Sequence, residues 1–334
     1  MKAYNVYGIG HALVDVECHV DEPFLRQIGL QKGSMTLVDA QRQAELSDKL
    51  KHQVVHRSSG GSASNTMIGL AQMGGKGFHS CKVADDEPGQ FFTADMRANG
   101  VDNASRPSDP KQGVTGQCLV MITPDAERTM CTHLGISETF SVENLSEHHL
   151  RQAEYLYIEG YLVSSPTTRQ AAVAAKAHAR ANGVKTALTF SDVSMIQYFR
   201  DGMDEFVSGG IDLLFCNENE ALSYAGTDSL DVAIRRLKEI AASFCLTLGP
   251  RGAKVYGNGE MINLAGIKVK AVDTNGAGDL FAGAFLYGIT HGHTPARAGN
   301  LAIHASAQLV TQYGARLQTA QADQIKSSSG VHHE

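Results

Sequence analysis

A run of small residues ending in a carboxylate carries the strongest chemical signal in the chain. Residues 273–279 read Asp-Thr-Asn-Gly-Ala-Gly-Asp and open a helical pattern. We expect the backbone N–H groups of Gly276, Ala277 and Gly278 to face an anion at the positive end of that helix. Asp279 can accept the proton of a substrate hydroxyl there; alternatively, it only stabilises the first helical turn. An anion site beside such a base suits phosphoryl transfer.

Two regular elements must position this turn. The β-rich run before it predicts a strand over residues 267–272, and the apolar run after it predicts a helix over 276–290. From about residue 150 onward, strand and helix patterns alternate. Such alternation predicts an α/β fold with a mostly parallel sheet and helices on both of its faces.

A second group of polar residues in the first half of the chain suits a substrate with hydroxyl groups. Gly60 and Gly61 occupy a strand-to-helix junction, where glycines permit close approach of a ligand. Asn65 follows in the first helical turn and can both donate and accept hydrogen bonds, which suits vicinal hydroxyls. Asp15 lies in an otherwise apolar, alternating strand, where a polyol would supply its partners. The alternatives are an ordinary capped helix and a strand carboxylate facing solvent.

Two further segments follow predicted strands in the second half. Asn217 and Glu220 fall on one helix face, where they suit a hydrated Mg²⁺ shared with phosphates. They also match a capping box, and both readings can hold together. The turn at residues 249–252 follows a strand that ends near Thr247. It suits the nucleotide side of a site, or it is an ordinary turn.

Short alternating segments in the first half predict a small second sheet. Residues 12–20, 34–38, 53–57 and 115–134 alternate with period two and carry polar residues on one face. This pattern indicates antiparallel strands with one wet face. Because ordinary βα material separates them, we expect a discontinuous β lid that leaves the main body and returns to cover a cleft.

Composition excludes several classes of function. The 334 residues carry a net charge of −6 and no Trp, which argues against a nucleic-acid or membrane-surface binder. No apolar run approaches the length of a membrane span, and residues 1–10 lack a signal-peptide core. The six cysteines lie far apart, so we expect reduced, buried thiols in a cytoplasmic protein. We expect one domain over residues 1–326 and a polar tail over 327–334.

Together these segments resemble the ribokinase-like superfamily, the PfkB family of carbohydrate and nucleoside kinases. The resemblance rests on the Gly-Gly-x-x-x-Asn and Asp-Thr-x-Gly-Ala-Gly-Asp segments in this order. It implies a three-layer α/β/α sandwich with a β lid, and ATP and Mg²⁺ as cofactors, with a monovalent cation such as K⁺ near Asp273. It implies that Asp279 is the general base and that the backbone of Gly276, Ala277 and Gly278 forms the anion hole. It implies that Asp15, Gly61 and Asn65 bind the sugar and that Asn217 and Glu220 bind the metal through water. The residues on the ATP side are then Thr247, Gly249, Gly252 and Asn300.

The segment 157–162, Tyr-Ile-Glu-Gly-Tyr-Leu, looks like the nucleobase pocket of the adenosine kinase branch. In that reading Tyr161 and apolar lid residues near Leu13 and Leu134 pack against a purine. Arg128 on a lid strand clamps the transferring phosphate; alternatively, Arg128 is a solvated lid charge. Glu159 and His11 differ from the branch pattern. A carboxylate at Glu159 that faces the base would favour inosine or guanosine, or would serve a sugar without a base.

These observations favour a kinase for a primary hydroxyl of a nucleoside, adenosine first. The alternatives are a sugar kinase of the ribokinase, fructokinase or 2-keto-3-deoxygluconate kinase kind, and a non-catalytic protein that binds nucleosides or sugars. Asp279 argues against the last alternative, because a binding protein does not need a base. We expect a monomer or a lid-mediated homodimer, with no nucleic-acid or membrane partner.

Overall fold

The computed structural model describes residues 2–103, 112–125 and 127–328. Its main element is a nine-stranded sheet with the order β14-β13-β12-β11-β10-β9-β1-β5-β6. The strands from β6 to β12 in this order are parallel, and β13 and β14 add an antiparallel edge. Their bounds are β1 Tyr4–Ile9, β5 Gly77–Ser80, β6 Val101–Asn103, β9 Ala153–Ile158, β10 Lys185–Thr189, β11 Ile211–Asn217, β12 Ala241–Thr247, β13 Gly252–Gly257 and β14 Glu260–Ala265.

The central strands are apolar on both faces, as buried parallel strands must be. In β11, Leu213 and Phe215 join one buried cluster, whereas Leu214 and Cys216 join the other. Successive side chains of a strand point to opposite faces, so each cluster fills one side of the sheet. Both clusters need a layer of helices to close them.

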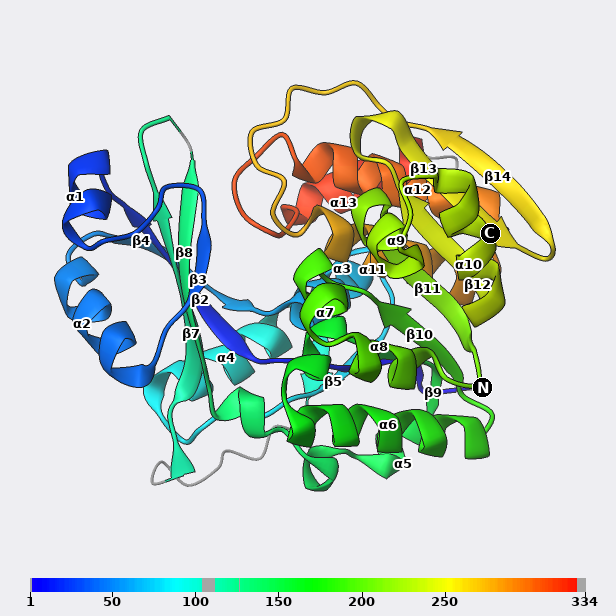
Figure 1. Ribbon diagram of the computed structural model, residues 1–334, viewed down its shortest axis with the longest axis horizontal. Helices are drawn as coiled ribbons and strands as arrows, with labels where there is room; N and C mark the ends of the chain where they lie inside the picture. The colour runs from blue at the N-terminus through cyan, green and yellow to red at the C-terminus, as the bar shows by residue number, and fades with distance from the viewer. Residues whose placement is uncertain (1, 104–111, 126, 329–334) are drawn as a thin grey trace.

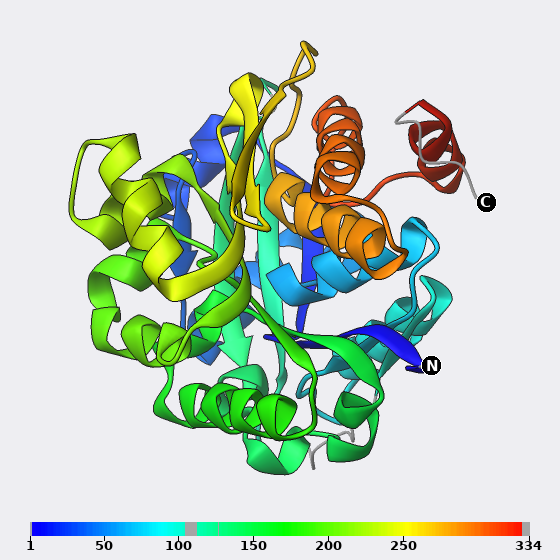
Figure 2. The same cartoon turned by 90° about the vertical axis from the view of Figure 1, so that its right-hand side faces the viewer.

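Helices cover both faces and complete a three-layer α/β/α sandwich (Figures 1 and 2). One layer shares its core with α3 Ser62–Gln72, α4 Glu87–Ala98, α11 Ala277–Thr290, α12 Pro295–Leu309 and α13 Thr319–Ser328. The other contains α5 Glu147–Arg151, α6 Pro166–Ala181, α7 Val193–Tyr198, α8 Arg200–Val207, α9 Glu218–Ala225 and α10 Leu230–Ile240. Short 3-10 turns are η2 Ile136–Thr139, η3 Val142–Asn144, η4 Gly160–Ser164 and η5 Gly249–Arg251.

A second sheet of five strands, in the order β3-β8-β7-β2-β4, forms the lid. Its strands are β2 Leu13–His19, β3 Met35–Leu37, β4 Val54–Gly60, β7 Thr115–Ile122 and β8 Arg128–Gly135. The pairs β2–β4 and β7–β8 are antiparallel, but β2–β7 and β3–β8 are parallel. The lid is therefore a mixed sheet rather than a wholly antiparallel one. A period of two in the sequence indicates a strand with one polar face, but it does not fix strand direction.

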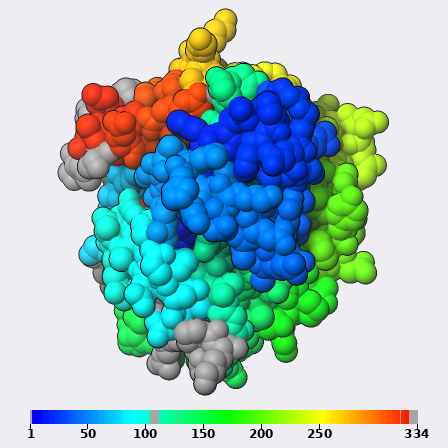
Figure 3. Space-filling view, turned by 90° about the vertical axis from the view of Figure 1, so that its left-hand side faces the viewer, coloured from blue at the N-terminus to red at the C-terminus, as the bar shows by residue number. Residues whose placement is uncertain are grey.

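Two helices cover the outer side of the lid, α1 Glu22–Gln27 and α2 Ala40–Leu50 (Figures 1 and 3). Buried residues of both, including Leu25 and Leu46, pack in one cluster with Cys18 and Cys131 of the lid strands. The exposed apolar side chains of the lid instead follow its two edges, with Leu37 on β3 and Val55 on β4. A lid-mediated homodimer remains a prediction, and the edges are the part of the lid free to form it.

One predicted strand is wrong. Residues 267–272 form an extended loop without a strand partner, and Val269 and Val272 are largely exposed. The loop leaves the sheet after the edge strand β14 and returns toward α12, where the N–H of Val272 donates to the carbonyl of Val310 at 2.7 Å. Its alternating Val and Lys residues have the composition of a strand, but the chain has left the sheet edge.

At the end of the chain, α13 extends to Ser328, so residues 327 and 328 are helical rather than part of a tail. The rest of the predicted tail, residues 329–334, lies outside the described residues. All six cysteines are free thiols and buried, as predicted. No helix in the described part of the chain is long and apolar enough to cross a membrane.

Candidate active site

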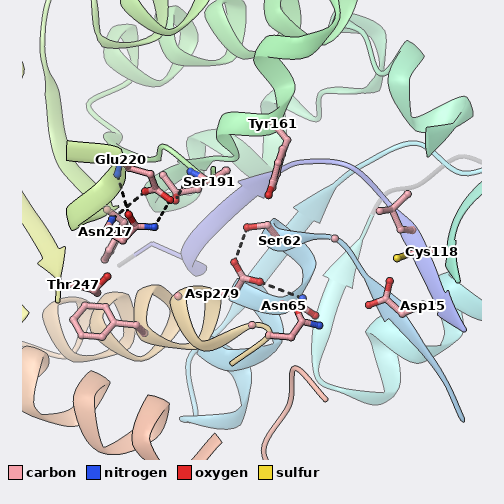
Figure 4. A pocket seen from close by; sticks show the side chains of 18 of the residues that line it. Asp15, Ser62, Asn65, Cys118, Tyr161, Ser191, Asn217, Glu220, Thr247 and Asp279 are labelled. Carbon is pink, nitrogen blue, oxygen red and sulfur yellow. Dashed lines mark hydrogen bonds between the residues drawn. The ribbon is translucent and has the colours of Figure 1, made fainter. Parts of the chain in front are cut away.

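A cavity of about 390 Å³ lies between the main sheet and the lid. It opens at the carboxyl ends of the parallel strands, where α/β sheets commonly bind ligands. Side chains from the lid, from α3, from α9 and from α11 point into it (Figure 4). Ten of the predicted site residues line it, namely Asp15, Gly61, Asn65, Tyr161, Asn217, Glu220, Thr247, Gly276, Gly278 and Asp279.

Asp279 is a half-buried residue whose carboxylate is held by two side chains of α3. Ser62 Oγ donates to its Oδ1 at 2.6 Å, and Asn65 Nδ2 donates to its Oδ2 at 3.2 Å (Figure 4). Burial raises the pKa of Asp279 to about 6, and the bonds from Ser62 and Asn65 oppose that rise. A carboxylate with this pKa is ionised near neutral pH and remains basic enough to accept a proton.

The turn before Asp279 is built for close approach by a ligand. Gly276 is the N-cap of α11 and has a left-handed backbone with φ of 73°. A Cβ on Gly276 would lie 2.6 Å from Ala315 Cβ, whereas a Cβ on Gly278 would meet no atom within 4 Å. The Ala277 N–H donates to the Thr274 carbonyl at 3.2 Å. The open side of Gly278 therefore leaves the start of α11 accessible to an anion from the cavity.

The two glycines before α3 are required by their surroundings. A Cβ on Gly60 would lie 2.2 Å from Oδ1 of Asp15, and one on Gly61 would lie 2.2 Å from the His11 carbonyl. Gly61 also has φ of 96°, a conformation that favours glycine. Asp15 lies against this junction in the cavity, and burial raises its pKa to about 7. Gly60 thus makes room for the carboxylate of Asp15, and Gly61 makes room for the His11 carbonyl.

Glu159 does not face the acceptor cavity, so the expectation that it contacts a nucleobase is wrong. Its side chain is buried, with 1% of the residue exposed. Its Oε2 accepts from the Ala63 N–H at 2.8 Å, and its Oε1 accepts from the His11 N–H at 3.3 Å. Two backbone donors hold the carboxylate beneath the cavity wall, and burial raises its pKa to about 8.

Tyr161 lines the cavity from the other side, and its hydroxyl end points inward (Figure 4). Leu13 lines the cavity as well, whereas Leu134 does not. The buried His11, whose pKa burial lowers to about 4, lies behind the cavity wall and does not line it.

Asn217 and Glu220 form a reciprocal capping box at the start of α9. The Glu220 N–H donates to Asn217 Oδ1 at 2.9 Å, and the Asn217 N–H donates to Glu220 Oε2 at 3.0 Å. Both side chains line the cavity, and burial raises the pKa of Glu220 to about 7. No group of three or more His, Cys, Asp or Glu side chains gathers as a metal site within the described ranges.

A second, mostly apolar cavity of about 430 Å³ adjoins the first. The two share Thr247, Gly278 and Phe281. Gly249 and Gly252 line the second cavity, as predicted, but Asn300 does not. Asn300 is exposed on α12, one turn before Ile303, which is the first residue of that helix to reach the cavity.

Arg128 reaches from lid strand β8 to the loop before the anion-binding turn. Its Nη2 lies 2.8 Å from Oδ2 of Asp273 and 3.6 Å from Oε1 of Glu17. Asp273 also accepts from the N–H groups of Asn275 at 3.0 Å and Gly314 at 2.9 Å. The guanidinium is therefore ion-paired with Asp273, the carboxylate near which we expected K⁺. Arg128 does not line the first cavity.

The sequence reasoning missed several residues of the site. Ser62 was overlooked, although it lies next to Gly61 and opens the helix that carries Asn65. Ser191 lines the cavity with φ of 66°, which is unusual for a residue other than glycine, and its Oγ accepts from the Gly160 N–H at 2.9 Å. The lid also contributes an apolar wall made by Leu13, Cys118, Val120 and Met130.

The carboxylate of Asp279 lies at the open start of α11, next to Gly278, which both cavities share. Residues 32–322 match the family model described as pfkB family carbohydrate kinase, so the chain belongs to the PfkB family.

The most similar proteins include kinases of both nucleosides and sugars. An adenosine kinase of Dictyostelium discoideum is 25% identical over 336 residues, which cover 94% of this chain and 97% of that protein. The structure of a probable sugar kinase from Rhizobium etli has a TM-score of 0.90 and 32% identity, covering 99% of this chain and 100% of the other. The structure of an adenosine kinase from Sinorhizobium meliloti has a TM-score of 0.88 and 34% identity, covering 97% and 99%.

Proposed function

We propose that this kinase transfers the γ-phosphoryl group of ATP to a primary hydroxyl of a nucleoside, with adenosine as the first candidate. One observation carries the proposal, namely the division of the acceptor cavity into a polar floor and an apolar wall. Asp15, Asn65 and Asp279 make the floor, and side chains of the lid make the wall. A nucleoside has the same division, because its ribose carries hydroxyls and its base presents a flat, weakly polar face.

Asp279 acts as the general base in this proposal. Asp15 and Asn65 bind the other hydroxyls and orient the primary hydroxyl toward Asp279. The hydroxyl attacks the γ-phosphorus as its proton passes to Asp279, the bond to the bridging oxygen of ADP breaks, and that oxygen leaves with the electron pair. The N–H groups at Gly276 and Gly278 stabilise the charge on the phosphoryl oxygens, which is the main requirement of phosphoryl transfer. The N–H of Ala277 joins them only once it leaves the Thr274 carbonyl.

The second cavity suits ATP. Its apolar lining and its glycines, Gly249 and Gly252, allow an adenine ring and its ribose to pack closely, and Thr247 lies where the two cavities meet. Asn217 and Glu220 fit a Mg²⁺ ion held mainly by phosphates and water, since Mg²⁺ usually keeps several waters in such sites. Bound Mg²⁺ would neutralise phosphate charge.

Arg128 would serve as a phosphate clamp only after it separates from Asp273. Two further donors hold Asp273, so the carboxylate can remain in place when the guanidinium leaves. Because Arg128 supplies the positive charge beside Asp273, a K⁺ ion at that carboxylate would compete with it.

A sugar kinase is the second candidate. The relative described as a probable sugar kinase favours it. The number of carboxylates near the cavity favours it as well, because a substrate rich in hydroxyl groups needs hydrogen-bond acceptors in its site. The apolar lid wall weighs against it, since a free sugar would leave that wall without a partner.

The deciding experiment measures ADP formation with adenosine, inosine, guanosine, ribose, fructose and 5-dehydro-2-deoxygluconate under matched ATP and Mg²⁺. We expect the highest kcat/KM with a nucleoside. Strong activity with a free sugar and none with any nucleoside would exclude the primary proposal and support the second. The Asp279→Asn variant serves as the background control, because it lacks the base.

A further inference from the structure

The buried carboxylate of Glu159 lies where three segments of the acceptor site meet. Glu159 follows strand β9, and its own N–H donates to the Ile9 carbonyl at 3.1 Å. Its carboxylate accepts from the His11 N–H in the connection between β1 and β2, and from the Ala63 N–H at the start of α3. The sheet pairs the ends of β1 and β9 up to Ile9 and Ile158, and the Glu159 side chain adds a link from this point to the start of α3.

Each of these segments continues into residues that line the acceptor cavity. The connection after His11 leads to Asp15, and Ala63 lies between Ser62 and Asn65. The segment after Glu159 carries Tyr161. Glu159 itself does not line the cavity, so it influences the acceptor only through these neighbours.

The carboxylate of Glu159 packs closely against the backbone at Gly10. A Cβ on Gly10 would lie 2.3 Å from Oε2 of Glu159 and 2.5 Å from the Cβ of Ala63. A carboxylate also lies favourably at the start of α3, because the positive end of the helix dipole faces it. Both oxygens meet N–H donors. Above its pKa of about 8, Glu159 is a carboxylate that satisfies both donors, whereas an amide side chain has one acceptor atom and one donor atom.

We propose that Glu159 is a positioning residue of the acceptor site, and that its carboxylate fixes the β1–β2 connection relative to the start of α3. It thereby sets the distance between Asp15 and the Ser62–Asn65 pair that holds Asp279. The identity of this cavity as the acceptor site rests on the proposed function.

The first test is the Glu159→Gln variant, which keeps the size of the side chain and replaces one acceptor atom by a donor. At a pH of about 9, where Glu159 is ionised, we expect the KM for the best acceptor to rise about tenfold, with the KM for ATP changed by less than about twofold. The matched control is Asp86→Asn. Asp86 also accepts two backbone N–H groups, from Gly89 at 2.9 Å and Thr115 at 2.8 Å, but it does not line the cavity. A similar rise of the acceptor KM in Asp86→Asn would show that general loosening is sufficient and would overturn the proposal.

A second variant tests the same carboxylate without removing it. Gly10→Ala introduces a Cβ into the space of Oε2 and should displace the carboxylate, so it should also raise the acceptor KM selectively. In the Gly10→Ala/Glu159→Gln double variant, the acceptor KM should rise by much less than the product of the two single increases, because both substitutions act through the Glu159 carboxylate. Increases of the acceptor KM that multiply in the double variant would show that the two substitutions act independently, which would contradict the proposal.

A measurement without any substrate separates this inference from the proposed function. Amide hydrogen exchange at His11 and Ala63 should accelerate in Glu159→Gln and remain unchanged in Asp86→Asn. Unchanged exchange at both amides overturns the positioning role, even if the enzyme is a nucleoside kinase. If the wild type phosphorylates no acceptor, the proposed function fails, and the exchange result alone decides whether Glu159 holds the two segments.

Discussion

The hydroxyl of Ser62 donates a 2.6 Å hydrogen bond to the carboxylate of Asp279, although the two residues are 217 positions apart in the chain. This bond joins the start of α3 to the first turn of α11. It fixes one oxygen of Asp279 and favours its ionised form. The reactivity of Asp279 therefore depends on a residue that the sequence motifs do not include.

Replacing the base should abolish most of the turnover. Asp279→Asn keeps the shape of the side chain but cannot accept a proton, so we expect kcat to fall by about 10²–10⁴. Ligand binding and thermal stability should change little, and calorimetry and thermal shift with ATP and acceptor check both. Turnover close to that of the wild type would remove Asp279 from the mechanism.

The pH dependence of activity should follow Asp279. Burial raises its pKa to about 6, and the base must be ionised, so kcat/KM should fall as the pH drops through about 6. Ser62→Ala removes a bond that lowers this pKa, and the acid limb of the profile should therefore move to higher pH. The measurement is kcat/KM across this range for both proteins, with Ser34→Ala as a control at a distant serine that does not line the cavity. A shift to lower pH would contradict this account of the site.

Loss of Asp15 should weaken the acceptor alone. Removing a charged hydrogen-bonding partner costs about 1.5–3 kcal/mol, which corresponds to roughly ten- to a hundredfold in affinity. Isothermal titration of Asp15→Ala with acceptor and with an ATP analogue tests this directly. Equal weakening of both ligands would indicate a folding defect instead.

The aromatic ring of Tyr161 separates the two kinase proposals. Contact of an aromatic side chain with a base contributes about 1–3 kcal/mol, so Tyr161→Ala should raise the KM for a nucleoside about tenfold or more. The same change should hardly affect a free sugar, which has no base. Steady-state kinetics with both kinds of acceptor provide the comparison, and an unchanged KM for every nucleoside would contradict contact with the base.

The Arg128–Asp273 pair should couple the lid to the loop before α11. Both side chains are less than 10% exposed, and breaking a buried pair by removing one partner costs about 3–5 kcal/mol. Arg128→Met should therefore lower the free energy of unfolding by about 3 kcal/mol, and adding Asp273→Asn should restore part of it. Urea unfolding of both single variants and the double variant measures the coupling. Additive losses would show that the contact contributes no interaction energy of its own.

Residues at strand-to-helix junctions could be predicted from the sequence, because their geometry is local. Gly61, Asn65, Asn217, Glu220 and Gly276 follow from glycine placement, helix capping and the strand before each turn. Glu159 could not be placed in this way, since its partner Ala63 lies 96 positions away and the carboxylate turns from the cavity toward backbone donors.

The predictions for Asn300 and for residues 267–272 failed for a similar physical reason. Asn300 lies on α12 one turn before Ile303, the first residue of that helix to reach the cavity. Residues 267–272 have the alternation of a strand but no neighbouring strand with which to pair. Periodicity determines which way a side chain points, whereas the partner of a segment depends on the whole fold.

The two adjoining cavities differ in the part of the fold that builds them. The shared boundary of Thr247, Gly278 and Phe281 belongs to the main sheet and α11, while the apolar wall of the acceptor cavity belongs to the lid. Substitutions of lid residues such as Cys118 and Met130 can therefore reshape the first cavity without altering the boundary that it shares with the second. This separation gives a physical reason why a single architecture serves both nucleosides and sugars among the relatives of this chain.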